Sequence, residues 1–175
     1  MTPSRRAAAA GSVVLAAAVI AGGLVFLLRR DDDTASPGGS LGSVLGDSRA
    51  AAAPFTGLTE VRLGVDGDCR RVVVADDVDE RATGLMRRRD LGPYGGMLFV
   101  FDGPTSSPFT MSDVPVPLDI GWYDAAGRPL DHTLMQPCPR RAPAECPVYQ
   151  STGPYRYALE TLGGDLPSGA IGACP

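Results

Sequence analysis

The stretch GMLFVF, residues 96–101, decides the fold of this chain. It is a short apolar run with glycine and proline on both sides, which is typical of a buried β-strand. The run LDIGWY at residues 118–123 has the same character, and RVVVA at residues 71–75 is rich in β-branched side chains. Such runs predict a domain whose core is built mainly from strands.

Weaker strand patterns surround these three runs. Residues 60–65 and 155–161 alternate apolar and polar side chains, and residues 128–135 follow a turn signal. One short helix is predicted where Asp77 precedes Glu80 with the spacing of a capping box. The expected fold class is mainly β (α+β): a β-sandwich or squashed barrel with one short helix, preceded by a single transmembrane helix.

The transmembrane helix is expected in residues 7–28, which are 22 residues without a charge. Arg5-Arg6 precede them and Arg29-Arg30 follow them. As a helix the segment would be about 33 Å long, enough to cross the hydrocarbon core of a bilayer. A cleaved signal peptide is the alternative, but its apolar region is usually shorter. We therefore predict that residues 1–30 anchor the chain in a membrane.

The rest of the chain divides into a predicted linker and one domain. Residues 31–57 are rich in Gly, Ser, Ala and Asp without apolar periodicity, which indicates a flexible linker. Residues 58–175 have the size of a single domain. There, 11 Arg stand against 16 Asp and Glu, a net charge of −5, which argues against binding nucleic acid. The chain has no lysine to serve a phosphate loop or a Schiff base, and we expect no cofactor.

The cysteines indicate where the domain works. Cys69, Cys138, Cys146 and Cys174 are even in number and form no CxxC pair, and the one histidine, His132, argues against a zinc site. Disulfides in an oxidising compartment are the simplest account. Because one pair flanks a short polar loop and the other lies near the ends of the domain, we predict the bonds Cys69–Cys174 and Cys138–Cys146. The expected location is the cell membrane, single-pass, with the C-terminal domain extracytoplasmic.

Several motifs follow one another along the domain: VVVAD at 72–76, GLM at 84–86, GMLFVF at 96–101, FTM at 109–111, VPLDI at 116–120 and RYALE at 156–160. In this order they resemble the domain-of-unknown-function 192 family, over about residues 69–172. The resemblance implies a compact, mostly β domain, found alone or behind an export signal or anchor, and implies no established activity. The family commonly has Trp directly before the methionine of the FTM motif and Lys-Asn-Thr after it. Here Ser112, Asp113 and Val114 follow Met111, so no ligand role carries over to them.

Asp119 is the polar residue that stands out, because it lies inside an apolar run. A buried carboxylate is costly unless it is paired, and the cluster Arg87-Arg88-Arg89 after the predicted helix supplies cations. In one interpretation Asp119 and Arg87 or Arg88 line a ligand pocket or act as an acid–base group. In the other, which we favour, Asp119 forms a structural ion pair or caps backbone amides.

Methionine thioethers are soft ligands that select Cu(I), so Met86, Met97 and Met111 form a weak copper alternative. His132 and Met135 would add to such a site only if their strand bends, because strand residues three apart point to opposite faces. Methionine also fills irregular cores, and we expect that role and no metal site.

The candidate ligand-binding residues are Asp119, Arg87, Arg88, Met86, Met111 and Phe109. No catalytic residue is identified: the chain has no nucleophile elbow, and neighbouring strand residues such as Asp131 and His132 point apart. We favour a binding module for a small molecule or a cell-envelope component. The alternatives are an enzyme that uses Asp119 and an arginine, and a structural or assembly partner of an envelope protein.

Overall fold

The computed structural model describes residues 40–165 and 169–175. The predicted membrane anchor at residues 1–30 lies outside these ranges. In the part of the chain that is described, no helix is both long and apolar enough to span a membrane.

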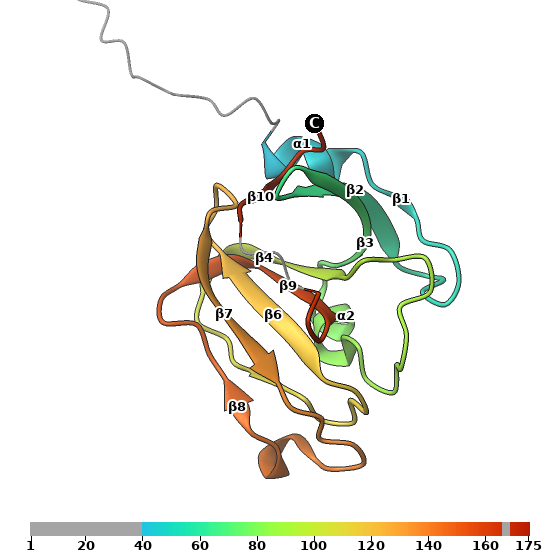
Figure 1. The fold of residues 1–175 in the computed structure, drawn as a ribbon, viewed down its shortest axis with the longest axis vertical. Coiled ribbons are helices and arrows are strands. Elements are labelled where there is room, and N and C mark those ends of the chain that lie inside the picture. Colours follow the sequence, from blue (N-terminus) through green and yellow to red (C-terminus); the bar gives the residue numbers. More distant parts are fainter. Residues whose placement is uncertain (1–39, 166–168) are drawn as a thin grey trace, which may run out of the picture. The chain divides into compact units, whose positions relative to one another are not determined.

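Eight strands form one mixed sheet in the order β1-β2-β3-β4-β9-β6-β7, with β10 paired to β2 (Figure 1). Their bounds are β1 Arg49–Ala50, β2 Thr59–Val65, β3 Asp68–Ala75, β4 Met97–Thr105, β6 Leu118–Tyr123, β7 Pro129–Met135, β9 Tyr155–Leu162 and β10 Ile171–Gly172. Two further strands, β5 Phe109–Thr110 and β8 Val148–Tyr149, pair with each other. The helices are α1 Leu41–Gly46, α2 Val78–Thr83 and a 3₁₀ turn at Pro143–Glu145.

The mainly β prediction is confirmed, but the architecture differs from the expected sandwich or barrel. The ladder ends at β1 and β7 among the described residues, so the sheet is not closed. The second sheet consists only of two strands of two residues each. One pair, β3 with β4, is parallel, because the chain crosses over through α2 between them. Sequence patterns locate strands but not their partners, which explains the difference.

The first part of β4, Met97–Phe99, and the strand β9 are buried on both faces. On β4, Met97 and Phe99 join one core cluster, whereas Leu98 joins the other. On β9, Ala158 and Leu159 divide in the same way. This two-sided burial explains why GMLFVF is apolar throughout and does not alternate.

Helix α2 begins with the predicted capping box. The Asp77 carboxylate accepts a hydrogen bond from the Glu80 backbone N–H at 2.7 Å, and the Glu80 carboxylate accepts one from the Asp77 N–H at 3.3 Å. The helix ends at Thr83, with Gly84 as its C-cap. Leu85 and Met86 lie in the turn that follows the helix.

Part of the segment predicted as a flexible linker, residues 31–57, is folded. Helix α1 starts after the N-cap Ser40 and buries Leu41 and Val44. Phe55 is also buried and packs edge-to-face on Tyr94, with 5.7 Å between ring centroids. The composition of residues 31–57 suggested a linker because the few apolar residues of this segment show no helical or strand periodicity. They are buried by tertiary contacts, which no local pattern records.

Both predicted disulfides are confirmed. Cys69 is bonded to Cys174, which joins the start of β3 to the chain just after β10. Cys138 is bonded to Cys146 and closes a short loop that contains the 3₁₀ turn.

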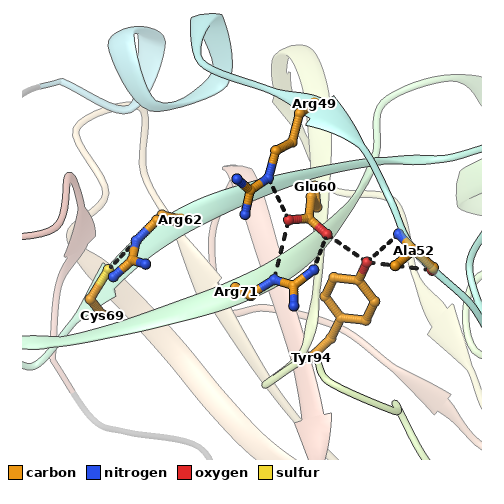
Figure 2. Close-up of polar contacts among 7 residues, drawn as sticks. All are labelled: Arg49, Ala52, Glu60, Arg62, Cys69, Arg71 and Tyr94. Atoms are coloured by element: carbon orange, nitrogen blue, oxygen red, sulfur yellow. Dashed lines mark hydrogen bonds and ion pairs between the residues drawn. The ribbon is translucent and has the colours of Figure 1, made fainter.

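Glu60 on β2 is buried, with 2% of its surface exposed, and its carboxylate is surrounded by donors (Figure 2). Oε1 accepts hydrogen bonds from Nε of Arg49 at 2.7 Å and from Nε of Arg71 at 3.2 Å. Oε2 accepts from Nη2 of Arg71 at 2.6 Å and from the Tyr94 hydroxyl at 2.6 Å. These donors, Arg71 first, lower the pKa of Glu60 to about 2. The Tyr94 oxygen also accepts from the Ala52 N–H at 2.6 Å, so the network fastens the N-terminal segment to the sheet.

We expect Glu60→Gln to lower the free energy of unfolding by about 2 kcal/mol at pH 7, because hydrogen bonds from charged donors to a carboxylate are lost. Urea unfolding followed by the fluorescence of the single tryptophan, Trp122, measures this. Since the folded-state pKa is depressed from 4.5 to about 2, the contribution is present above pH 4.5 and disappears as the pH falls toward 2. Asp102→Asn, at an exposed position of β4, is the matched control. Equal losses in both variants would contradict the assignment.

Candidate functional site

A cavity of about 350 Å³ lies beside the central strands. Segments far apart in the sequence form its walls: α2 and the turn after it, β4, the chain around β5, the disulfide-closed loop and β9. The lining is mainly apolar, and its larger side chains are Leu85, Met86, Phe99, Phe101, Phe109 and Val114. A concave, mostly apolar site of this size, with few polar groups, is typical of small-molecule binding.

Glu160 on β9 is the acidic residue of the described cavity lining. Its residue is 4% exposed, and no hydrogen bond or ion pair of the carboxyl group is found within residues 40–165 and 169–175. Its neighbours across the sheet are Met97 on β4 and Ile120 on β6, which are both apolar and buried. Burial therefore raises the pKa of Glu160 to about 8. At neutral pH the group is mostly a protonated carboxylic acid.

Arg81 on α2 is the other ionisable residue of the described lining. Its Nη1 donates hydrogen bonds to the carbonyl oxygens of Asp76 at 2.5 Å and Val100 at 2.8 Å. Its guanidinium carbon lies 5.0 Å from the ring centroid of Phe101, a cation–π distance. The arginine is therefore held over an aromatic wall and does not pair with Glu160.

Two motif glycines shape the cavity. Gly84 ends α2 with φ of 45°, and a Cβ there would lie 3.3 Å from Cζ of Phe99. At Gly96 a Cβ would lie 2.6 Å from the carbonyl oxygen of Glu160, so only glycine lets β4 begin this close to β9. Gly84 thus lets the turn after α2 approach Phe99, and Gly96 lets the chain that enters β4 approach the backbone of β9 at Glu160.

Residues 112–114, which depart from the family pattern, form hydrogen bonds that hold the loop closed by the Cys138–Cys146 disulfide. The Asp113 backbone N–H donates to the carbonyl of Cys138 at 3.0 Å, and the Ser112 hydroxyl donates to the carbonyl of Arg141 at 2.7 Å. That loop contributes Pro143 to the cavity lining. These polar residues therefore position one wall and do not face a ligand themselves.

The structure does not bring Asp119 together with Arg87 or Arg88. The Asp119 carboxylate accepts a hydrogen bond from the backbone N–H of Gly164, in the turn after β9. This is the backbone-capping role that the sequence analysis favoured alongside an ion pair. Asp119 is not among the residues that line the cavity.

The two arginines have separate partners. Nε of Arg87, an exposed side chain, lies 3.7 Å from Oδ2 of Asp113. The guanidinium carbon of Arg88 lies 4.8 Å from the ring centroid of Phe55. Neither belongs to the lining of the cavity that contains Glu160.

The remaining candidates divide between cavity and core. Met86 and Phe109 line the cavity. Met97 and Met111 are fully buried in the hydrophobic core, the role expected for methionine. His132 is exposed while Met135 is buried, so the two point apart. Among the residues that the structure describes, no group of three or more His, Cys, Asp or Glu could hold a metal ion.

Sequence reasoning missed Glu160, although RYALE was one of the motifs. Alternation predicts Tyr155, Tyr157, Leu159 and Thr161 on one face and says nothing of what covers the other face, where Glu160 lies. In the structure both faces of β9 are buried, and Tyr155 belongs to the same core cluster as Ala158, whereas Tyr157 and Leu159 belong to the other. The available signal was a single acidic residue between Leu159 and Thr161, in a run (residues 157–162) that otherwise has no charge.

The open mixed sheet and the cavity beside its central strand define a class of small, mainly β domain. The chain belongs to the DUF192 family, described as "Uncharacterized ACR", whose model matches residues 61–171. No curated protein matches the chain.

The solved structures that resemble this fold include two crystal structures. A protein of unknown function from Novosphingobium aromaticivorans DSM 12444 is 25% identical, with a TM-score of 0.58, and the match covers 71% of this chain and 93% of that one. A protein from Sinorhizobium meliloti 1021, described as a proposed transcription regulator, is 26% identical, with a TM-score of 0.53, and the match covers 64% of this chain and 90% of that one. The fold is therefore shared over nearly the whole length of both relatives.

We expect Glu160→Gln to remove a pH dependence from the stability. The folded wild type keeps the Glu160 proton up to about pH 8, whereas the unfolded chain releases it near pH 4.5. The associated stability is complete below pH 4.5 and is lost as the pH rises to 8, by at most about 1.4 kcal/mol per pH unit. Urea unfolding between pH 5 and pH 9 should show this slope in the wild type and in Asp102→Asn. The same slope in Glu160→Gln would exclude Glu160 as its source.

Proposed function

We propose that this domain is a small-molecule binding module and that the cavity lined by Glu160 is its binding site. The observation that carries the proposal is a buried carboxyl group that faces a cavity and has no partner within the described residues. Buried polar groups in folded proteins are nearly always hydrogen-bonded, so a carboxyl group that lines a cavity without a protein partner can receive one from a ligand.

The chemistry of the lining supports binding more than catalysis. Among the described lining residues only Glu160 and Arg81 are ionisable, and Nη1 of Arg81 is bonded to backbone carbonyls. An enzyme that uses Asp119 and an arginine finds no support in the geometry, because Asp119 caps the Gly164 amide outside the cavity. An assembly role has weaker support, from two exposed leucines on the edge strand β7, Leu130 and Leu134.

Small aromatic probes should enter the cavity. Benzyl alcohol and benzylamine match its aromatic walls, and for ligands of this size we expect at least one dissociation constant on the order of 1 mM. NMR shift changes at Phe99, Phe109 and Glu160 measure the binding. Ala82→Trp should abolish them by filling the cavity mouth, because Ala82 is an exposed lining residue. Ala125→Trp, at an exposed site outside the lining, is the control and should bind like the wild type.

We also propose that the domain works outside the cytoplasm, held at a membrane. The support is the uncharged segment at residues 7–28, with arginines on both sides, and the two disulfides of the domain. Disulfides persist in oxidising compartments and are rare in the cytosol. A ligand of this domain would then be a molecule of the cell envelope or its surroundings.

Cells that express the full chain should contain it with all four cysteines oxidised. Alkylation during denaturing lysis, without a reductant, should leave Cys69, Cys138, Cys146 and Cys174 unmodified. Cys138→Ser leaves Cys146 without its partner and gives the positive control for labelling. Recovery of full-length chain from the soluble cytosolic fraction with alkylated cysteines would refute the proposed location.

A further inference from the structure

We infer that the ligand of this cavity is an organic cation: an ammonium group on an apolar body, which pairs with the carboxylate of Glu160. The inference rests on the proposed binding function and names the class of molecule that the site would accept. It starts from the question of why this site contains a carboxyl group and not a neutral polar group.

A carboxyl group at this buried position can ionise, and its ionised form is costly among apolar neighbours. Glutamine or a hydroxyl residue would serve a neutral ligand and would never place a charge in this buried site, where a charge is far more costly than a neutral polar group. Met97 and Ile120, the cross-strand neighbours of Glu160, can neither donate a hydrogen bond nor balance a charge. The property that a carboxyl group adds is a negative charge when it ionises, and among apolar neighbours a cationic ligand is the partner that would stabilise that charge most.

The aromatic walls favour the same kind of ligand. Phe99, Phe101 and Phe109 line the cavity, and the faces of such rings attract cations. One ring of this wall already does so, because the Arg81 guanidinium carbon lies 5.0 Å from the Phe101 centroid. Phe99 and Phe109 are packed edge-to-face, with centroids 5.1 Å apart, so these two walls are held in place by each other.

The charges around the site define where the ammonium group would lie. Arg81 and Glu160 are the ionisable groups of the described lining; Arg81 is partly exposed on α2, and Glu160 is buried on β9. The arginine repels a cation near α2, so the ammonium group belongs beside Glu160 on β9. Residues 58–175 have a net charge of −5, which also attracts cationic ligands.

A cationic ligand and a neutral one would depend on pH in opposite ways. The empty site holds a proton on Glu160 below about pH 8. An ammonium ligand must displace this proton, so its affinity should fall about tenfold for each pH unit below 7. A neutral ligand that accepts a hydrogen bond from the protonated carboxyl group should keep its affinity there. A cation–carboxylate pair therefore makes the ligand affinity depend on pH, which shape complementarity alone would not do.

The test compares benzylamine, which is charged from pH 6 to pH 8, with its neutral analogue benzyl alcohol, by calorimetry and NMR on the wild type and Glu160→Gln. At pH 7.5 we expect benzylamine to bind at least about tenfold more tightly than the alcohol. Glu160→Gln should remove this advantage. Should the variant fail to fold, the fall in wild-type affinity for benzylamine between pH 7 and pH 6 decides the question.

The outcomes separate this inference from the proposed function. If benzyl alcohol binds in the cavity as tightly as benzylamine, or if the affinity for benzylamine is independent of pH, the cation is refuted and small-molecule binding stands. If neither probe shifts the resonances of Phe99, Phe109 and Glu160, both are refuted.

Discussion

A carboxyl group buried in a protein must either be paired with donors or hold its proton, and this domain contains one example of each solution. Glu60 receives hydrogen bonds from two arginines and a tyrosine, which lower its pKa to about 2. Glu160 has apolar neighbours, and burial raises its pKa to about 8. The first arrangement stabilises the fold, whereas the second leaves a polar group available for a ligand.

The Glu60 network explains how residues before the family region join the domain. The DUF192 match begins at residue 61, yet Arg49 and Ala52 are part of the network, Arg49 directly and Ala52 through Tyr94. Helix α1 and strand β1 consequently extend the same folded unit. The Cys69–Cys174 bond joins β3 to the segment after β10, and β10 pairs with β2 on the β1–β3 side of the sheet. An ion-pair network and a covalent bond thus secure the two ends of the described domain.

The cavity depends on contacts between segments that are distant in the sequence. Gly84 and Gly96 allow close packing near Phe99 and β9, and the loop closed by Cys138–Cys146 supplies another wall. The family motifs GLM, GMLFVF, FTM and RYALE each contribute to this lining. Four of the six motifs that carried the resemblance therefore meet at one site, although their spacing along the chain spans more than seventy residues. This convergence adds to the support for the cavity as the functional site.

The sequence by itself determined the strand-rich class, the six main strands, the capping box of α2, both disulfides and the family. These features depend on short-range patterns or on cysteine number and position, which a linear reading contains. Only the tertiary structure decided the open mixed sheet, the packing of residues 40–57 and the separation of Asp119 from the arginines. It also decided that Glu160, and not Asp119, lies in the cavity. The physical reason is that a strand is buried on both faces only by the elements that pack on it in the tertiary structure. The alternating pattern of β9 therefore does not reveal that Glu160 is buried.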